Sequence, residues 1–389
     1  MTAWDYRRFG TASDPIRQSA LGAFASQDGC GRRYRFERDA EAAGVERERA
    51  TSHWRPTIGT AVHRVIERAL SREPMVSAVL EGRLPSAQRI DAVLEEELVG
   101  AAEGRSIDWG DASQSNERIT ARWMVLGALR TVSERAQRIV AVEAPFVVEL
   151  DGYTMGGTID LVYEPRGAEP GASIALADWK TGERRTHQVV LDHGYQTGIY
   201  SHALSSGVLY PGTEREMRLG LHPESIHIVH LRSFASHERT RAVLAAVRES
   251  SDTSKELLVR VARRGWPVTT HVVAGALRAL SEAGLVTKRR AGKDTVWVAV
   301  DTDREPRADA IWLESRRRPD DVARLRVSLR TIVGTVRMGR FVEQLGEQCA
   351  RCPFRQQCLG DGHVSTETSA ELESALRGLD VSDLLPGVA

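Results

Sequence analysis

A carboxylate and an amine stand two residues apart at the end of a short apolar run, within the sequence from Ile174 to Gly182. Charged and Gly-rich sequence bounds the run, which predicts a buried strand. Because side chains alternate along a strand, Asp178 and Lys180 share one face and Trp179 points into packing on the other. An acid that holds a metal beside a lysine that handles a water would suit metal-assisted phosphodiester hydrolysis. The same pair also occurs on ordinary surface strands, so this pattern alone leaves both interpretations open.

Two companion residues could complete a metal site around that pair. Residues 57–69 predict an amphipathic helix in which Gly59 and His63 form a ridge beside the apolar stripe. A histidine there is usually a hydrogen-bonded core residue, but His63 could instead reach a metal beside Asp178, with Gly59 permitting close approach. Asp160 interrupts an apolar strand, where an unpaired carboxylate would be costly to bury, so it either faces solvent or binds a cation.

A β-hairpin is predicted to carry Asp160. Phe146–Leu150 and Tyr153–Tyr163 have strand character, and the dipeptide Asp151-Gly152 between them is a strong turn signal. The hairpin would place Asp160 in the same sheet as the strand that ends at Lys180.

Helices are predicted before and after these strands. Residues 74–140 predict a helical subdomain, whose last helix runs from Arg118 to Val140. His187–Leu204 is predicted as one helix, in which Gln196 and Tyr200 lie one turn apart. That spacing alone usually marks a solvent-facing pair. A good strand, Ile226–Leu231, follows.

The four cysteines form a candidate metal site of a second kind. Cys349, Cys352 and Cys358 follow C-x2-C-x5-C spacing, whereas Cys30 lies near the other end of the chain. Tight turns can aim three thiolates at one centre, and a tetrathiolate site forms if the two ends of the chain meet. This arrangement suits an iron-sulfur cluster, but spacing alone leaves zinc open. In a large chain that we expect to be cytoplasmic, four cysteines argue against a disulfide framework.

A basic hairpin follows two predicted helices. Thr253–Arg264 and Thr269–Gly284 are amphipathic, and Leu285–Val300 predicts a two-stranded hairpin. This order resembles a winged helix-turn-helix module, and its excess of basic residues is the footprint of a phosphate-binding element. A small packing insert or a protein-binding module would show the same pattern, so DNA contact does not follow from it. The residues expected in the wing are Lys288, Arg289, Arg290 and Lys293.

The remaining sequence predicts a strand, a long helix and an acidic tail. The strand is Asp309–Glu314, and Asp320 is expected to cap an amphipathic helix that continues through Leu345 toward the cysteines. The tail after Gly360 has one amphipathic stretch, Ser369–Leu385.

Composition places the chain among soluble globular proteins of more than one domain. Its 389 residues are 41% hydrophobic and 27% charged, which is enough to bury a sizeable core. Basic and acidic residues both number 53, so a DNA-binding surface must be local. The N-terminus lacks the apolar core of a signal peptide, and no run approaches the roughly 20 apolar residues of a membrane span, so we expect a cytoplasmic protein with no membrane partner.

Four motifs in order resemble the motif series of RecB-type nucleases of the PD-(D/E)XK superfamily. They are Gly59–His63, Gly157–Asp160, Asp178–Gly182 and Gln196–Tyr200. The cysteines before and after them resemble the iron-sulfur staple of the AddB-like and CRISPR-adaptation branches. The resemblance spans residues from about 19 to 237 and about 305 to 360. The basic module interrupts the pattern, and the third motif uses Asp178 where many members use Glu, which is within the family's range.

The resemblance implies roles for these residues. His63, Asp160 and Asp178 would ligate one or two Mg²⁺ or Mn²⁺ ions, which carboxylate-rich sites suit. Lys180 would orient or help deprotonate the attacking water, or stabilise the pentavalent charge. The four cysteines would hold a 4Fe-4S cluster, with zinc as the less favoured alternative. The residues expected to position the DNA strand are Gln196 and Tyr200.

We therefore expect an α/β fold of the PD-(D/E)XK restriction-endonuclease-like type, a mixed sheet flanked by helices. The expected parts are residues 1–237 as the first part of the nuclease core with a helical subdomain at about 74–140, 238–304 as the winged-helix-like insertion, 305–360 as the second part of the core with the cysteines, and 361–389 as the tail.

The expected activity is metal-dependent hydrolysis of DNA, by an exonuclease that acts on single strands or ends. Repair, recombination, phage defence and CRISPR-like spacer capture are compatible settings. No G-x-x-x-x-G-K-[ST] phosphate loop occurs, so unwinding would need a separate helicase or complex. The alternative is a catalytically inactive DNA-binding or regulatory protein on a nuclease scaffold with a winged helix.

Overall fold

The computed structural model describes residues 4–25, 29–43, 51–183, 186–211, 216–264, 268–300, 306, 312–316, 321–346, 349 and 352–359. The chain divides into two compact units. The sheet unit comprises the described residues among 10–18 and 47–329, and the terminal unit comprises those among 1–9, 19–46 and 330–389.

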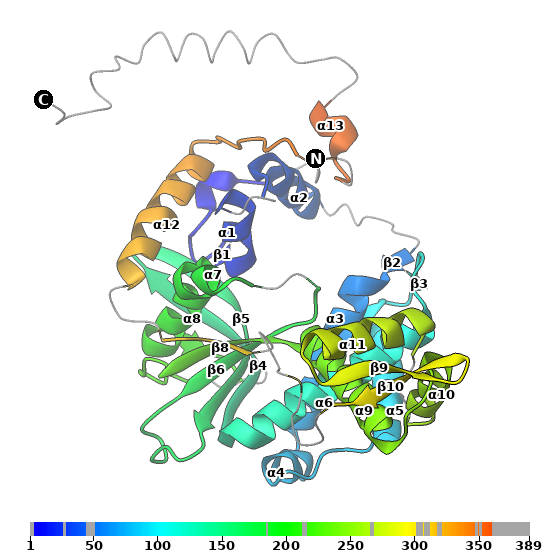
Figure 1. Ribbon diagram of the computed structural model, residues 1–389. Coiled ribbons are helices and arrows are strands. Elements are labelled where there is room, and N and C mark those ends of the chain that lie inside the picture. The colour runs from blue at the N-terminus through cyan, green and yellow to red at the C-terminus, as the bar shows by residue number, and fades with distance from the viewer. Residues whose placement is uncertain are drawn as a thin grey trace, which may run out of the picture. The chain divides into compact units, whose positions relative to one another are not determined.

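A mixed sheet of seven strands forms the centre of the sheet unit (Figure 1). Its strands are β1 (Ile16–Arg17), β4 (Ala136–Leu150), β5 (Tyr153–Pro165), β6 (Ala175–Lys180), β7 (Val208–Leu209), β8 (Ser225–His230) and β11 (Trp312–Ser315). The order is β11-β8-β6-β5-β4-β7, and β1 pairs with β5. β6 is parallel to β8 and β1 to β5, whereas the other pairs are antiparallel. The mixed sheet confirms the expected fold class.

The predicted hairpin is confirmed, with one strand longer than expected. Asp151 and Gly152 have φ angles of 54° and 76°, so both central residues of the turn adopt the left-handed conformation that tight hairpins need. The prediction that a helix continues to Val140 is wrong, because α6 (Gln114–Arg135) ends at Arg135 and β4 begins at the next residue. The β-branched Ile139, Val140 and Val142 favour a strand, and β5 supplies the pairing.

Helices cover the sheet face that Trp179 joins. They are α3 (Trp54–Ser71), α4 (Met75–Leu80), α5 (Ala87–Ala101) and α6, accompanied by the small pair β2 (Thr51–His53) and β3 (Ser106–Asp108). The apolar stripe of α3 packs with Ala175, Ala177 and Trp179 of β6 in one core. Strand alternation therefore leaves Asp178 and Lys180 on the opposite face, as predicted.

The segment after β6 forms two helices where one was predicted. α7 (Gln188–His193) ends at Gly194, and α8 (Tyr195–Ser206) starts directly after it. A Cβ at Gly194 would lie 2.3 Å from the carbonyl oxygen of Val190, so the sharp change of direction requires glycine.

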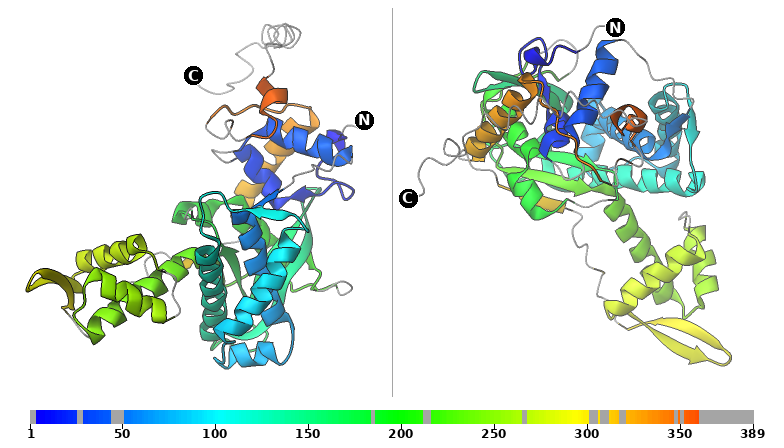
Figure 2. Two further views of the ribbon diagram at one scale, coloured as in Figure 1. Left: turned by 90° about the vertical axis from the view of Figure 1, so that its right-hand side faces the viewer. Right: turned by 90° about the horizontal axis from the view of Figure 1, so that it is seen from above.

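A separate core lies under the basic hairpin. It joins the last turns of α9 (Leu231–Glu249) to α10 (Ser254–Arg263), α11 (Thr270–Glu282), β9 (Val286–Ala291) and β10 (Asp294–Ala299). We call residues 243–299 the hairpin module. Figure 2 shows the β9-β10 hairpin extending beyond the module's helices. The predicted helices and hairpin are present, whereas the winged-helix identity and the bounds 238–304 stay predictions. The first bound falls inside α9.

The terminal unit brings together segments from both ends of the sequence. It contains the short 3-10 helix Tyr6–Arg8, most of α1 (Gln18–Ala25), α2 (Gly31–Ala42), the end of α12 (Asp321–Arg337) and α13 (Arg355–Leu359). Trp4 packs edge-on against Phe9 and Tyr34, and its ring also meets Phe341. These contacts join the first residues of the chain to the segment after α12.

The long helix predicted to pass through Leu345 is shorter. α12 ends at Arg337, Gly339 follows with φ of 70°, and Leu345 is 69% exposed. A left-handed glycine just past the last turn is a common helix stop. The predicted cap Asp320, the beginning of the predicted strand 309–314 and the tail 361–389 lie outside the described residues. Among the helices of the described residues, none is both long and apolar enough to cross a membrane.

Candidate active site

The Asp178–Lys180 pair lies on the central strand of the sheet. β6 lies between β5 and β8, and Asp178 is only 2% exposed. The Nζ of Lys180 lies 2.6 Å from Oδ2 of Asp178. Burial lowers the pKa of Lys180, but the Asp178 carboxylate outweighs that effect and the pKa is raised above its usual value. Lys180 is therefore held in its charged form beside a buried acid.

Asp160 is buried next to this pair. Its exposed fraction is 8%, and its Oδ2 accepts a 2.7 Å hydrogen bond from the backbone N–H of Trp179. The alternative in which Asp160 faces solvent is therefore wrong. Burial and the nearby Asp178 raise the pKa of Asp160 to about 8. The charged form of Asp160 is disfavoured, because it is removed from water and lies beside a second negative charge. A cation would relieve this repulsion.

Helix α3 and strand β4 add a histidine and a second acid. Nδ1 of His63 lies 2.9 Å from Oε1 of Glu143 and 3.8 Å from Oδ2 of Asp160. Burial lowers the pKa of His63, but the hydrogen bond to Glu143 and the charge of Asp160 raise it to about 9. Ligand atoms of His63, Glu143 and Asp160 all lie within 4.8 Å of one another. One nitrogen and carboxylate oxygens at this spacing fit a hard divalent cation such as Mg²⁺ or Mn²⁺.

Glu143 is the site residue that sequence reasoning missed. It has φ of 42°, which is unusual for a residue with a side chain, and it follows the part of β4 where the register with β5 shifts. The irregular backbone re-aims this side chain toward His63. The available signal was a lone acid between apolar residues, Val142 and Ala144, in a strand-like segment.

Helix α8 holds Asp178 from its other side. Nε2 of Gln196 donates to Oδ1 of Asp178 at 2.8 Å, and Oε1 of Gln196 accepts from Lys180 at 3.3 Å. The hydroxyl of Tyr200 donates to the carbonyl of Thr158 at 3.0 Å and lies 3.3 Å from Oδ1 of Asp178. The interpretation of Gln196 and Tyr200 as a solvent-facing pair is therefore wrong.

Tyr200 belongs to the candidate site through its hydrogen bond to Asp178. Its side chain is 1% exposed, and its hydroxyl also accepts a 2.8 Å hydrogen bond from Nε2 of Gln18. Tyr200 is thus placed to hold the Asp178 carboxylate in position, whereas Gln196 is only partly buried. The DNA-binding role of both residues stays a prediction. Gln18 was not predicted, since it lies far from the motifs in sequence.

Gly59 lets α3 approach the end of β6. A Cβ at this position would lie 2.8 Å from Oγ1 of Thr181, the residue directly after Lys180. That distance is too short for a carbon and an oxygen, so a side chain at position 59 would force the Thr181 hydroxyl to move. The predicted close approach at Gly59 is thereby confirmed as contact between protein segments.

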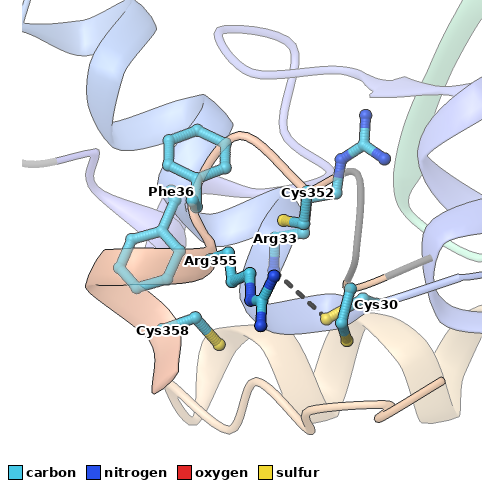
Figure 3. A pocket seen from close by; sticks show the side chains of 8 residues that line it. Cys30, Arg33, Phe36, Cys352, Arg355 and Cys358 are labelled. Carbon is cyan, nitrogen blue, oxygen red and sulfur yellow. Dashed lines mark hydrogen bonds between the residues drawn. The ribbon is translucent and has the colours of Figure 1, made fainter. Parts of the chain in front are cut away.

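The four cysteines line one hollow in the terminal unit. Figure 3 shows Cys30, Cys352 and Cys358 around this hollow. Its lining residues are Cys30, Arg33, Phe36, Cys349, Cys352, Phe354, Arg355 and Cys358. All four thiols are free. The predicted meeting of Cys30 with the C-terminal trio is confirmed, because all four cysteines line the same hollow.

Contacts around the hollow join α2 to the cysteine-rich segment. The rings of Phe36 and Phe354 stack with centroids 5.3 Å apart, and Arg32 forms an ion pair with Glu343. The backbone N–H of Arg33 donates to the sulfur of Cys30 at 3.4 Å. Cys30 thereby caps the start of α2.

The model of the PD-(D/E)XK nuclease superfamily matches residues 19–359. The chain belongs to this superfamily. A comparison with curated protein sequences finds no matching relative. Superfamily membership, together with the buried carboxylates on a mixed sheet, makes the protein a hydrolytic, metal-dependent nuclease. Mg²⁺ or Mn²⁺ is the cofactor of this chemistry.

The predicted DNA-binding residues of the hairpin lie on the surface of the hairpin module. Lys288, Arg289, Arg290 and Lys293 are all exposed. Their contact with DNA stays a prediction.

Proposed function

We propose that the protein is a Mg²⁺- or Mn²⁺-dependent DNA exonuclease that hydrolyses phosphodiester bonds at single strands or DNA ends. The observation that carries the proposal is the placement of His63, Glu143 and Asp160 within 4.8 Å beside the Asp178–Lys180 ion pair. Asp160 and Asp178 are both buried, and Glu143 is half-buried beside them. Like charges placed this close together cost free energy unless a cation compensates them.

The residues divide into metal-holding and water-handling groups. His63, Glu143 and Asp160 hold the divalent ion, and Asp178 completes the acidic side of the site. The bound ion supplies polarisation of the scissile phosphate and a lowered pKa of the attacking water. Trp179 contributes its backbone N–H, which fixes the Asp160 carboxylate.

Lys180 acts mainly as a charge. Its ammonium group lies beside the Asp178 carboxylate, where it would orient the attacking water by hydrogen bonding and stabilise the charge that develops on the phosphate. Gln196 holds the side chains of Lys180 and Asp178 in fixed relative positions, because it forms a hydrogen bond with each of them.

Degradation of end-labelled DNA tests the proposal. We expect wild-type protein with Mg²⁺ or Mn²⁺ to digest the substrate, and Asp178→Ala and Lys180→Ala each to lose on the order of 100-fold or more in rate. Lys255→Ala, an exposed lysine in α10, is the matched control and should keep full activity. A wild type inactive on every substrate would favour the alternative, a catalytically inactive DNA-binding or regulatory protein.

The form of the substrate separates the finer parts of the proposal. An exonuclease should digest linear single strands and leave circular single strands intact, whereas an endonuclease cuts both. Substrates labelled at either end give the polarity, and RNA of the same sequence gives the sugar preference. Adding a helicase to duplex substrate tests whether the protein depends on a separate unwinding partner.

We also propose that Cys30, Cys349, Cys352 and Cys358 hold a 4Fe-4S cluster that joins the two ends of the chain. Four free thiols around one hollow support a tetrathiolate site, and the nearby Arg33 and Arg355 side chains would offset the negative charge of a cluster. Zinc is the alternative for the same thiols.

Metal analysis of protein purified without oxygen tests this second proposal. We expect brown protein with iron and acid-labile sulfide in equal amounts, and loss of both in Cys30→Ser together with a lower melting temperature. Colourless protein with stoichiometric zinc would replace the cluster by a zinc site. Unchanged metal content and stability in Cys30→Ser would refute the staple itself.

The hairpin module belongs to the same functional proposal. We propose that 238–304 is a winged-helix-like insertion between the two parts of the nuclease core, and that Lys288, Arg289, Arg290 and Lys293 contact DNA phosphates. Their exposure and charge support this role.

A further inference from the structure

Three aromatic rings stack at the start of α3. His53 ends β2, Trp54 begins α3, and Trp109 directly follows β3, the parallel partner of β2 (Figure 1). The centroid of the Trp54 ring lies 6.1 Å from that of His53 and 6.5 Å from that of Trp109. The interplanar angles are only 18° and 15°. The pairing of the two strands therefore brings three nearly parallel rings together.

The three rings differ in exposure. Trp54 is only 6% exposed and belongs to the core, whereas Trp109 is half-buried and His53 is exposed. The Nδ1 atom of His53 accepts a hydrogen bond from the backbone N–H of Arg55 at 3.2 Å, which fixes the ring at the start of the helix. Core packing explains the buried Trp54, but it does not explain the exposed ring stacked on it.

Arginine side chains surround the Trp54 ring. The guanidinium carbons of Arg55 and Arg232 lie 5.1 Å and 5.6 Å from its centre. Arg55 forms an ion pair with Glu183 at 3.6 Å, and Arg232 forms one with Glu117 at 2.9 Å. Each of these two cations therefore has one acid beside it.

A third cation in this group, Arg239, has no acid of its own. It is half-buried and follows Arg232 by two turns of α9. Its side chain forms no ion pair or hydrogen bond with the residues that the structure describes. Burial first, and then the charge of Arg232, lowers its pKa, although Glu117 opposes this effect. Because a desolvated cation without a counter-ion costs free energy, this position favours an anion.

The stacked rings lie beside the end of the catalytic strand. The Nε of Arg232 donates to the carbonyl oxygen of Thr181 at 3.2 Å. Glu183 follows Lys180 by three residues, which span at most about 11 Å. The helix that begins with Trp54 also carries the histidine of the metal site. The rings and the arginines are therefore attached directly to the segments that form the active site.

We propose that the rings of His53, Trp54 and Trp109 form a platform for the bases of single-stranded DNA, and that Arg239 binds one of its phosphates. Every base has a π face, so aromatic side chains bind single strands by stacking, while arginine side chains neutralise the backbone. The inference rests on the proposed function in taking DNA as the polymer. It adds the form of DNA that the site holds, a strand with unpaired bases beside the metal.

Binding without divalent metal tests the platform separately from catalysis. The probes are a fluorescent DNA strand of about 20 nucleotides, an abasic strand with the same number of phosphates, and the corresponding duplex, measured by anisotropy in EDTA. We expect wild-type protein to bind the strand with bases about 10-fold or more tightly than the abasic strand, because only the former can stack.

Two variants remove one ring each. His53→Asn removes the exposed ring and keeps a side chain suited to cap α3, so its melting should match that of wild type. Trp109→Leu keeps an apolar side chain against the core. Each variant should bind the strand with bases about 5-fold or more weakly, and the abasic strand as wild type does. In the nuclease assay, each should raise KM more than it lowers kcat.

A third variant tests the phosphate contact. Arg239→Gln should reduce the slope of log affinity against log salt by about 0.7, the contribution of one phosphate contact on a single strand. Its melting temperature should be at least that of wild type, because the substitution removes a desolvated charge without a counter-ion. Arg89→Gln, an exposed arginine of α5, is the matched control and should bind as wild type does.

Four results would overturn the inference. Wild-type protein might fail to bind the single strand in EDTA, bind the abasic strand equally well, or bind the duplex more tightly than the single strand. The fourth result is wild-type affinity in all three variants. DNA cleavage with metal, together with any of these results, would leave the proposed nuclease function intact. Binding as expected without any cleavage would instead refute the nuclease function alone.

Discussion

Replacing Asp160 with asparagine removes one ionisable acid from the group that it forms with Asp178, which is also buried, and the half-buried Glu143. The side chain keeps an oxygen that can accept from the Trp179 N–H, and its volume hardly changes. In the metal-free protein the pKa of Asp160 is raised from 3.8 to about 8, by burial first and then by Asp178. The folded state therefore binds more protons than the unfolded state between these pH values. Its stability falls as pH rises through this window.

The expected magnitude follows from that shift. At pH 7 only the part of the shift between 3.8 and 7 affects stability, and it corresponds to about 4 kcal/mol at 1.36 kcal/mol for each pKa unit. The positive charge of His63 lowers the pKa of Asp160, so its attraction already opposes this shift. We therefore expect metal-free Asp160→Asn to be more stable than wild type by on the order of 1–3 kcal/mol at pH 7.

Melting experiments with and without Mn²⁺ test the expected stability of metal-free Asp160→Asn and its expected loss of metal binding. Wild type should gain about 2.7 kcal/mol when free metal is 100-fold above its dissociation constant, whereas Asp160→Asn should gain little and lose nuclease activity. Glu169→Gln, which neutralises an exposed acid in a loop, is the matched control and should keep the metal-induced gain. An asparagine variant that is less stable without metal, or that keeps the full gain with Mn²⁺, would refute the reasoning.

Three further substitutions test the fold. Burial, and to a smaller extent the charge of Arg135, lowers the pKa of His227 from 6.5 to about 4. The contribution of neutral His227 to stability is therefore present above pH 6.5 and is lost as pH falls toward 4. His227→Gln should remove this pH dependence, which is up to about 3 kcal/mol in urea denaturation at pH 7 against pH 4.5. Gly127→Ala should cost about 1–3 kcal/mol, because its Cβ would lie 2.4 Å from the ring of Phe234, and thermal melting should show it. Gly275→Ala should instead gain about 0.5–1 kcal/mol in the same measurement, because its Cβ meets open space. Equal effects of the two glycine changes would contradict the packing argument.

Local sequence determined the elements that depend on short-range physics. The β4-β5 turn followed from Asp151-Gly152, and strand alternation placed Asp178 and Lys180 on one face with Trp179 on the other. The order of the helices and hairpin in the hairpin module was also readable, because each element has its own apolar pattern. The ends of helices and strands were predicted less accurately. Residues 136–140 are strand because they pair with β5, and Gly194 divides one predicted helix into two.

The candidate site shows the same division more sharply. Sequence supplied His63, Asp160, Asp178 and Lys180 because their residue types carry chemistry at motif spacing. Glu143 escaped, since its side chain turns toward His63 only through the irregular backbone of β4 beside β5.

Which polar side chains are buried was likewise decided only by the tertiary structure. A helix with Gln196 and Tyr200 on one face looks the same in sequence whether that face meets water or a carboxylate. Only the packing of α8 beside β6, and the approach of Gln18 from the far N-terminal segment, closes the hydrogen-bond network on Asp178. Sequence alone determined which groups could do chemistry, because residue type and local period are encoded in neighbouring positions. The tertiary structure decided which of them share one buried site, because segments far apart in the chain supply the partners and exclude the water.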